Sequence, residues 1–169
     1  PRGRFQVVRG AGGVIGIGDY AHTPDALKNV LSTIDAVCGE EERVITVVGC
    51  GGDRDRTKRP VMARIAADLS HTVVLTSDSP RSEDPNTIIH EMRTGLTVVD
   101  QSKVLVNADR HEAIRMAVTL ARPGDVVLAV LAIVVSNIFY SYGESLNAAF
   151  LPELARRDAL GRVSGWGWS

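Results

Sequence analysis

Charged side chains follow three short apolar runs, each just before a pattern typical of a helix start. Asp19 and His22 follow the first run, in the segment Asp-Tyr-Ala-His-Thr-Pro. Arg54 follows the second, in Gly-Gly-Asp-Arg-Asp, and Asp78 and Arg81 follow the third, in Asp-Ser-Pro-Arg. Guanidinium groups bind carboxylates or phosphates through paired hydrogen bonds, and the carboxylates could hold ribose hydroxyl groups or orient the arginines. The residue types therefore predict a site for an anionic ligand.

Each of these residues also has a simpler interpretation. Asp19 and Thr23 could serve only to cap a helix, and the run 53–56 could be a solvated loop. The remaining histidines have no partner pattern and are interpreted as surface residues: His71, His90 and His111. The chain contains no GxxxxGK[ST] segment and no His/Cys cluster with metal-ligand spacing, so neither a P-loop nor a metal site is predicted. Three polar connections at one sheet edge would favour a binding site over the simpler interpretation.

The elements that must position these residues alternate between strand and helix patterns. Apolar runs at 14–18, 43–48, 72–76, 103–106 and 126–128 are typical of buried strands. The glycines of segment 10–13 precede a strand rather than follow one, which favours a hairpin loop over a dinucleotide-binding fingerprint. The alternation predicts an α/β fold with a doubly wound, mostly parallel, Rossmann-like sheet, whose strand-to-helix connections gather at one edge.

Helix starts are marked by capping residues. Thr23-Pro24 and Asp84-Pro85 place a cap before a proline, and Asp109 with Glu112 resembles a capping box. The second helix is expected to begin at Pro60, with its inward face formed by Val61, Met62, Ile65 and Leu69.

Composition limits the classes of partner and compartment. The formal net charge of the 169 residues is -1, which argues against a nucleic-acid partner. Cys38 and Cys50 lack CxxC spacing, which favours a reduced, cytoplasmic location. The chain begins Pro1-Arg2-Gly3-Arg4 without a methionine, so we expect it to be cut from a longer protein.

The polar segments carry a specific resemblance. Segments 19–27, 49–55 with Lys58-Arg59-Pro60, and 76–81 agree in order and spacing with the C-terminal domain of MurE. MurE comprises the UDP-N-acetylmuramoyl-tripeptide synthetases of bacterial peptidoglycan synthesis, and the resemblance covers roughly residues 1–128. It implies an enzyme that uses ATP and magnesium to join a diamino acid to UDP-MurNAc-L-Ala-D-Glu through an acyl phosphate.

The resemblance also implies roles for individual residues. Arg4 and Asp19 fall on positions that contact the nucleotide, and His22 belongs to the same motif beside it. Arg54 falls on a position that holds the incoming diamino acid. The motif spanning Asp78, Ser79 and Arg81 holds that amino acid as well, so its arginine points to meso-diaminopimelate rather than lysine, because it can pair with the distal carboxylate.

The sequence departs from the family pattern in three ways. Ser79 stands where the motif usually has Asn, which weakens the preference for diaminopimelate over lysine. Gly124-Asp125-Val126-Val127-Leu128 is followed by an apolar segment instead of the Gly-Lys-Gly-His-Glu loop that completes the amino-acid pocket. The family's substrate domain and its ATP-binding domain, which binds most of the ATP and magnesium, are not in this sequence. We therefore expect no catalytic residue in this chain and no ligase activity from it alone.

A compositional boundary falls near residue 129. Segment 126–143 contains no charged residue, and six of the eight aromatic residues of the chain follow residue 130. Segments 147–154 and 161–168 resemble a loop between transmembrane helices of major facilitator superfamily permeases related to vacuolar amino-acid effluxers. The apolar stretch is about long enough for one membrane span of ~20 residues. The simpler interpretation is a buried strand and helix of a soluble domain.

These observations predict two units: 1–128 as a Mur ligase C-terminal domain and 129–169 as a foreign apolar helix and loop, joined as a chimera. The predicted function is that of a MurE-type ligase domain, with UDP-MurNAc-dipeptide and meso-diaminopimelate as partners and possible membrane contact through the tail. Two alternatives stay open, a membrane transporter fragment and a non-catalytic nucleotide- or anion-binding module.

Overall fold

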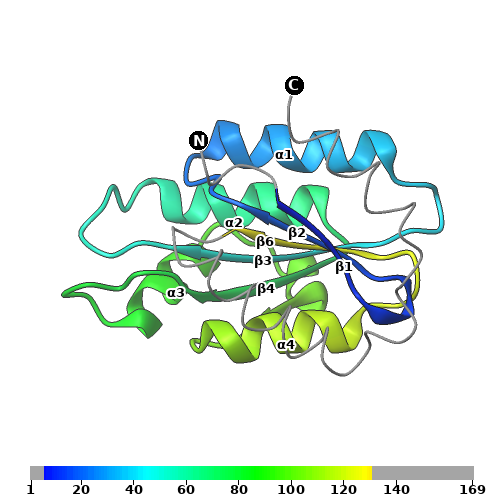
Figure 1. Cartoon of the computed structure of the whole chain (residues 1–169). Helices are drawn as coiled ribbons and strands as arrows, with labels where there is room; N and C mark the ends of the chain where they lie inside the picture. The colour runs from blue at the N-terminus through cyan, green and yellow to red at the C-terminus, as the bar shows by residue number, and fades with distance from the viewer. Residues whose placement is uncertain (1–5, 131–169) are drawn as a thin grey trace.

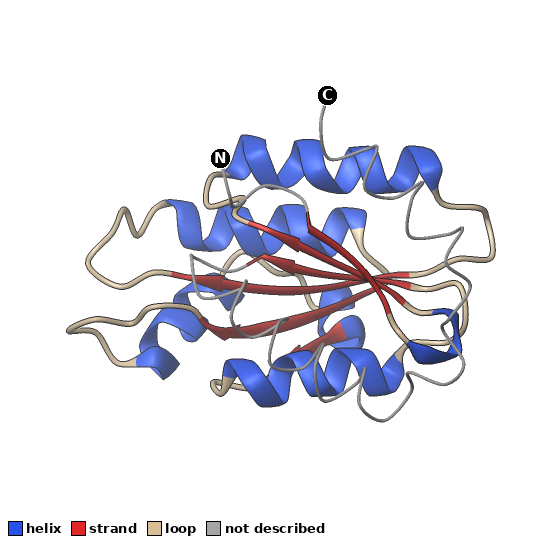
Figure 2. Ribbon diagram, viewed as in Figure 1, coloured by secondary structure: helices blue, strands red, loops and turns tan. Residues whose placement is uncertain are grey.

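The structure is a computed structural model that describes residues 6–130. Six strands form one sheet in the order β1-β2-β6-β3-β4-β5. The strands are β1 (Gln6–Arg9), β2 (Ile15–Asp19), β3 (Val44–Cys50), β4 (Thr72–Ser77), β5 (Val104–Val106) and β6 (Val126–Val130). The helices are α1 (Pro24–Val37), α2 (Lys58–Leu69), α3 (Pro85–Arg93) and α4 (Arg110–Leu120), with 3-10 turns η1 (Ala11–Gly13) and η2 (Val99–Lys103). Figures 1 and 2 show the sheet between two helical layers.

The sheet is parallel except for its outermost strand, β1. β1 pairs with β2 antiparallel through a hairpin closed by η1, which confirms the predicted hairpin loop. The pairs β2·β6, β6·β3, β3·β4 and β4·β5 are all parallel. The predicted doubly wound, mostly parallel α/β fold is confirmed.

Alternate residues of the central strands face different helical layers. Val126, Leu128 and Val130 of β6 join the core beneath α1, α2 and α3. Val127 and Ala129 of the same strand join the core beneath α4. β6 is therefore buried on both faces, and continuous apolar runs of this kind are typical of such strands.

The position of β6 corrects one expectation. The apolar tail was expected to start as a helix at Ala129, but Ala129 and Val130 belong to β6 and are 0% and 2% exposed. They pair with β2 on one side and β3 on the other. The α/β body therefore extends at least to residue 130. The remainder of the expected permease-like helix and loop, and the predicted chimeric junction, lie outside the described residues.

Three helices begin as the cap signals predict. The Thr23 hydroxyl accepts a hydrogen bond from the Ala26 amide, and the Asp84 carboxylate accepts one from Thr87. Asp109 accepts hydrogen bonds from the amides of residues 111 and 112, but its own amide donates to Asn107 rather than to Glu112. The reciprocal half of the predicted capping box is thus replaced by a contact from the preceding loop.

The second helix differs more from its prediction. α2 begins at Lys58, before Pro60, and Val61 is 44% exposed rather than inward-facing. Its buried face consists of Arg59, Met62, Ala63, Ala66 and Ala67. Met62 is buried and Ile65 and Leu69 pack against the core as expected, so among the four predicted residues Val61 alone was misassigned. Periodicity judged on large apolar side chains also missed the small alanines and the arginine that complete this face.

Candidate functional site

The three polar connections lie at one edge of the sheet. Because β2, β3 and β4 all run in the same direction, Asp19, Asp53 and Asp78 follow strand ends on the same side. β6 lies between β2 and β3, so the connection after β2 is separated from the other two by one strand. The predicted common edge is confirmed, with the loops after β3 and β4 as direct neighbours.

The loops after β3 and β4 are fastened to each other. The Gly52 amide donates to the Ser79 carbonyl at 2.8 Å. The Asp53 carboxylate accepts hydrogen bonds from the Ser82 hydroxyl at 2.6 Å and the Ser82 amide at 3.3 Å. A Cβ atom on Gly52 would lie 1.8 Å from the Pro80 carbonyl oxygen, so only glycine allows this approach. The two loops therefore form one unit, which we call the paired loops (51–57 and 78–84).

Two residues of the paired loops have left-handed backbone conformations. Asp53 and Arg81 both have φ of 52°, and they are the non-glycine residues with positive φ in the described chain. For an L-amino acid this conformation costs roughly 1–2 kcal/mol per residue. Such conformations persist only where surrounding contacts impose them, and they concentrate at functional sites. Here Asp53 and Ser82, the residue after Arg81, are held together by two hydrogen bonds.

The charged run after β3 divides into partnered and unpartnered side chains. Asp53 bonds to Ser82, Asp55 accepts from the Thr57 amide and hydroxyl, and Arg56 pairs with Glu91. Within residues 6–130, Arg54 has no hydrogen bond or ion pair. It is exposed. All four residues 53–56 are exposed, as the solvated-loop interpretation expects, but three of their side chains are held by contacts within the protein and that of Arg54 is not.

Arg81 has the same character on the neighbouring loop. It is exposed, and the described part of the chain offers its guanidinium no hydrogen bond or ion pair. Arg54 follows Asp53 and Arg81 precedes Ser82, so the two arginines flank the contact that joins the loops. Two free guanidinium groups on one rigid unit fit a ligand with carboxylate groups.

Asp78 and Ser79 lie deeper in the loop after β4. Asp78 is 7% exposed, and its backbone carbonyl accepts from the Arg110 guanidinium at 2.5 Å. Ser79 contributes its carbonyl to the Gly52 contact. Because that contact uses the backbone, it does not require the asparagine of the family motif at this position.

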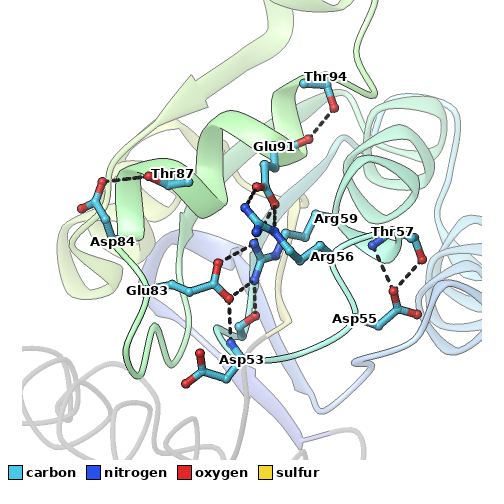
Figure 3. A network of polar contacts seen from close by, with 11 residues as sticks. Asp53, Asp55, Arg56, Thr57, Arg59, Glu83, Asp84, Thr87, Glu91 and Thr94 are labelled. Atoms are coloured by element: carbon cyan, nitrogen blue, oxygen red, sulfur yellow. Dashed lines mark hydrogen bonds and ion pairs between the residues drawn. The ribbon is translucent and has the colours of Figure 1, made fainter.

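A buried arginine that sequence analysis did not assign to the site supports the paired loops. Arg59 of α2 is 1% exposed and donates to both carboxylate oxygens of Glu83, at 2.9 and 2.8 Å. It also donates to Glu91 at 2.6 Å and to the Gly51 carbonyl at 3.1 Å (Figure 3). Helical spacing contains the missed signal, since residue 59 precedes Met62 and Ala63 by three and four positions on the buried face.

Electrostatics keep this cluster ionised. The hydrogen bonds from Arg59, with one from the Asp53 amide, lower the pKa of Glu83 to about 2. Hydrogen bonds from Arg56 and Arg59 lower the pKa of Glu91 as well.

A different effect acts on Cys50, at the end of β3: burial raises the pKa of its thiol to about 12, with Arg59 opposing and Asp78 adding to the shift. Cys50 is therefore a neutral thiol and unsuited to act as a nucleophile.

The connection after β2 forms the other part of the edge. Asp19 is half-buried at the strand end, while Tyr20 and His22 are exposed with ring centroids 4.7 Å apart. The His22 ring nitrogen Nδ1 lies 3.1 Å from the Tyr20 carbonyl oxygen. Thr23 caps α1, so capping falls to Thr23 rather than to Asp19. Arg4 lies outside the described residues.

Residues 6–130 contain no group of three or more His, Cys, Asp or Glu side chains placed to hold a metal ion. His71, His90 and His111 are exposed as predicted, although His71 also accepts a hydrogen bond from the Val44 amide at 3.0 Å. No helix of the described segment combines the length and apolarity needed to cross a membrane.

Comparison with known proteins agrees with this geometry. Residues 3–130 match the family described as Mur ligase, glutamate ligase domain. The chain therefore belongs to the Mur ligase family.

Within that family, the similarity is to one kind of ligase in particular. The chain is 56% identical over 126 residues to the UDP-N-acetylmuramoyl-L-alanyl-D-glutamate--2,6-diaminopimelate ligase of Cytophaga hutchinsonii, which covers 75% of this chain and 26% of that relative. A solved structure of a ligase of the same name is 42% identical with a TM-score of 0.69, covering 77% of this chain and 26% of that one. The chain thus spans about a quarter of the length of the curated relatives it matches.

A more distant structure shows how widely the fold is shared. The bifunctional folylpolyglutamate synthase/dihydrofolate synthase of Yersinia pestis, solved with AMPPNP and Mn, is 20% identical with a TM-score of 0.64. The alignment covers 85% of this chain and 32% of that protein. At this identity the likeness establishes the fold alone.

Proposed function

We propose that this chain is the amino-acid-binding domain of a ligase that adds meso-diaminopimelate to UDP-MurNAc-L-Ala-D-Glu with consumption of ATP. One observation supports this most: Arg54 and Arg81 are exposed, without partners among residues 6–130, on loops locked to each other. The names of the relatives that are about half identical in sequence supply the substrates.

The distal carboxylate of diaminopimelate is the proposed partner of Arg81. A guanidinium fork presents two parallel donors to a carboxylate, and each charged hydrogen bond contributes roughly 1.5–3 kcal/mol. Lysine lacks that carboxylate, so the same pocket would leave Arg81 unpaired. Arg54, Asp78 and Ser79 form the remainder of the proposed amino-acid site on the paired loops.

Asp19 and His22 are proposed to face the nucleotide. A carboxylate at a strand end suits ribose hydroxyl groups, and the exposed Tyr20–His22 ring pair suits the flat side of a base. ATP supplies the phosphoryl group that activates the substrate carboxylate. Magnesium is proposed to be held mainly by other domains of such an enzyme. ATP and a UDP-linked substrate both imply a cytoplasmic location.

The test uses a hybrid ligase, in which residues 3–130 replace the matching domain of the Cytophaga hutchinsonii relative, whose own sequence continues after residue 130. We expect ADP release that requires both UDP-MurNAc-L-Ala-D-Glu and meso-diaminopimelate. The 169-residue chain alone should release none, because its sequence contains no P-loop. A folded hybrid whose ADP release does not depend on meso-diaminopimelate would overturn the proposal. The permease resemblance rests on residues outside the described part, and we propose no function for it.

A further inference from the structure

A single arginine holds together three elements at the candidate site. The buried guanidinium of Arg59 donates to the Gly51 carbonyl in the loop after β3, to Glu83 in the loop after β4, and to Glu91 in α3. A buried arginine is tolerated only where acceptors pair with its charge, and here two carboxylates and a carbonyl accept from its Nη1 and Nη2 atoms, while Nε has no partner among residues 6–130. Arg59 therefore links both of the paired loops to the helical layer.

Glu83 extends this link to the strained residue Asp53. Its Oε1 atom accepts from Arg59 at 2.8 Å and also from the Asp53 amide at 2.7 Å (Figure 3). The Asp53 carboxylate in turn accepts from the Ser82 hydroxyl and amide, beside Glu83 in sequence. Hydrogen bonds therefore connect Arg59 to Glu83, Glu83 to Asp53 and Asp53 to Ser82, and the peptide bond between Ser82 and Glu83 closes the last three into a ring. We call these four residues the ring; Arg54 and Arg81 are each attached to one member in sequence.

Arg59 and Glu83 do not themselves present groups to a ligand. The Arg59 side chain is 1% exposed and the Glu83 side chain 20% exposed, and both carboxylate oxygens of Glu83 accept hydrogen bonds from Arg59. A second arginine cluster on α2 provides a contrast. Arg64 pairs with Asp68 and Asp100 and links α2 to η2, and none of its contacts in the described chain reaches the paired loops. The two clusters share their chemistry but differ in what they hold in place.

We propose that Arg59 and Glu83 are positioning residues for the amino-acid substrate: they fix the spacing of Arg54 and Arg81, so that both guanidinium groups meet one diamino dicarboxylate. This inference rests on the proposed function and goes beyond it, because it assigns substrate affinity to groups that do not touch the substrate. Misplacing binding groups by about 1 Å can cost up to ~100-fold in activity, so loosening the ring is expected to be costly.

The test measures steady-state kinetics of the hybrid ligase with Glu83→Gln. We expect the KM for meso-diaminopimelate to rise about 10- to 100-fold, while the KM for ATP and the kcat at saturating amino acid stay within about twofold. Asp100→Asn is the matched control, because it weakens the other arginine cluster of α2 and should leave the KM for meso-diaminopimelate unchanged. Ser82→Ala breaks the ring from the exposed side and should raise the same KM by a smaller factor, so the test stands even if Glu83→Gln fails to fold.

Two failures are distinguishable. If Arg81→Ala raises the KM for meso-diaminopimelate but Glu83→Gln and Ser82→Ala change it no more than Asp100→Asn, the positioning role is overturned and the proposed function stands. If Arg81→Ala leaves that KM unchanged, the proposed function itself fails. Equal losses of kcat/KM for meso-diaminopimelate and for ATP in Glu83→Gln would also overturn the inference, since they indicate general loss of structure.

Discussion

At the scale of single residues, the structure separates side chains that hold the loops from side chains left for a ligand. Sequence patterns placed Arg54 and Arg81 at the site, and both are exposed on the paired loops. They gave no indication that Asp53 and Arg81 adopt φ of 52°, since neither residue type requires it. They also missed the ion pair between Arg59 and Glu83. Helical spacing places Arg59 on the buried face of α2, but its pairing with Glu83 in the loop after β4 depends on a tertiary arrangement that spacing does not encode.

The ionisation of Glu83 makes stability depend on pH. Its folded-state pKa is about 2, below the ordinary value of 4.5, so its contribution is fully present above pH 4.5 and is lost as pH falls towards 2. Urea unfolding of the 169-residue chain from pH 7 to pH 2 should show this loss. Glu83→Gln should have a flatter profile, with its stability difference from the unmodified chain vanishing near pH 2. A difference that is the same at pH 7 and pH 2 would contradict the assigned ion pair.

The close approach at Gly52 gives a second prediction. Gly52→Ala places a Cβ atom 1.8 Å from the Pro80 carbonyl oxygen, so the paired loops must separate. Overpacking of this kind costs about 1–3 kcal/mol in the free energy of unfolding. Gly39→Ala is the control, because its Cβ would have no atom nearer than 3.8 Å, and it should change stability by less than ~0.5 kcal/mol. Equal unfolding free energies for the two variants, measured with denaturant, would refute the close contact.

At the scale of elements, local signals were the most informative. The prolines after Thr23 and Asp84 marked helix starts that the structure confirms, because caps depend on neighbouring residues only. Strand order could not be obtained in this way. The last described strand, β6, inserts between β2 and β3, which separates the connection after β2 from the paired loops. Val61 was misplaced for a related reason, since burial is decided by the packing of α2 and not by hydrophobicity alone.

The end of β6 has a measurable consequence. Ala129 and Val130 pair with β2 and β3, so their removal leaves ladder positions of two central strands without partners. A chain ending at residue 130 should therefore be more stable than one ending at residue 128, by about 1–3 kcal/mol for the unpaired buried groups. Denaturant unfolding of both truncated chains measures the difference. Identical denaturant midpoints for the two chains would instead support a domain boundary at residue 128, as predicted from the sequence.

At the scale of the whole molecule, the fold explains why binding groups far apart in sequence act together. A parallel sheet delivers the connections after β2, β3 and β4 to one edge, and ligands of open α/β sheets bind at such edges. The edge offers arginines, carboxylates and an exposed ring pair, which suits a binding surface. Other domains of a Mur ligase are proposed to supply the phosphate-binding and metal-binding groups.

The central claim is that Arg81 binds the amino-acid substrate, and kinetics of the hybrid ligase with Arg81→Ala test it most directly. Arg122→Ala is the matched control, since Arg122 is exposed before β6, at the opposite edge of the sheet. Loss of charged hydrogen bonds worth roughly 1.5–3 kcal/mol should raise the KM for meso-diaminopimelate about 10- to 100-fold, with the KM for ATP nearly unchanged. Arg81→Lys should restore little, because an ammonium lacks the planar fork. A KM for meso-diaminopimelate that is equal in Arg81→Ala, Arg122→Ala and the unmodified hybrid would contradict the account.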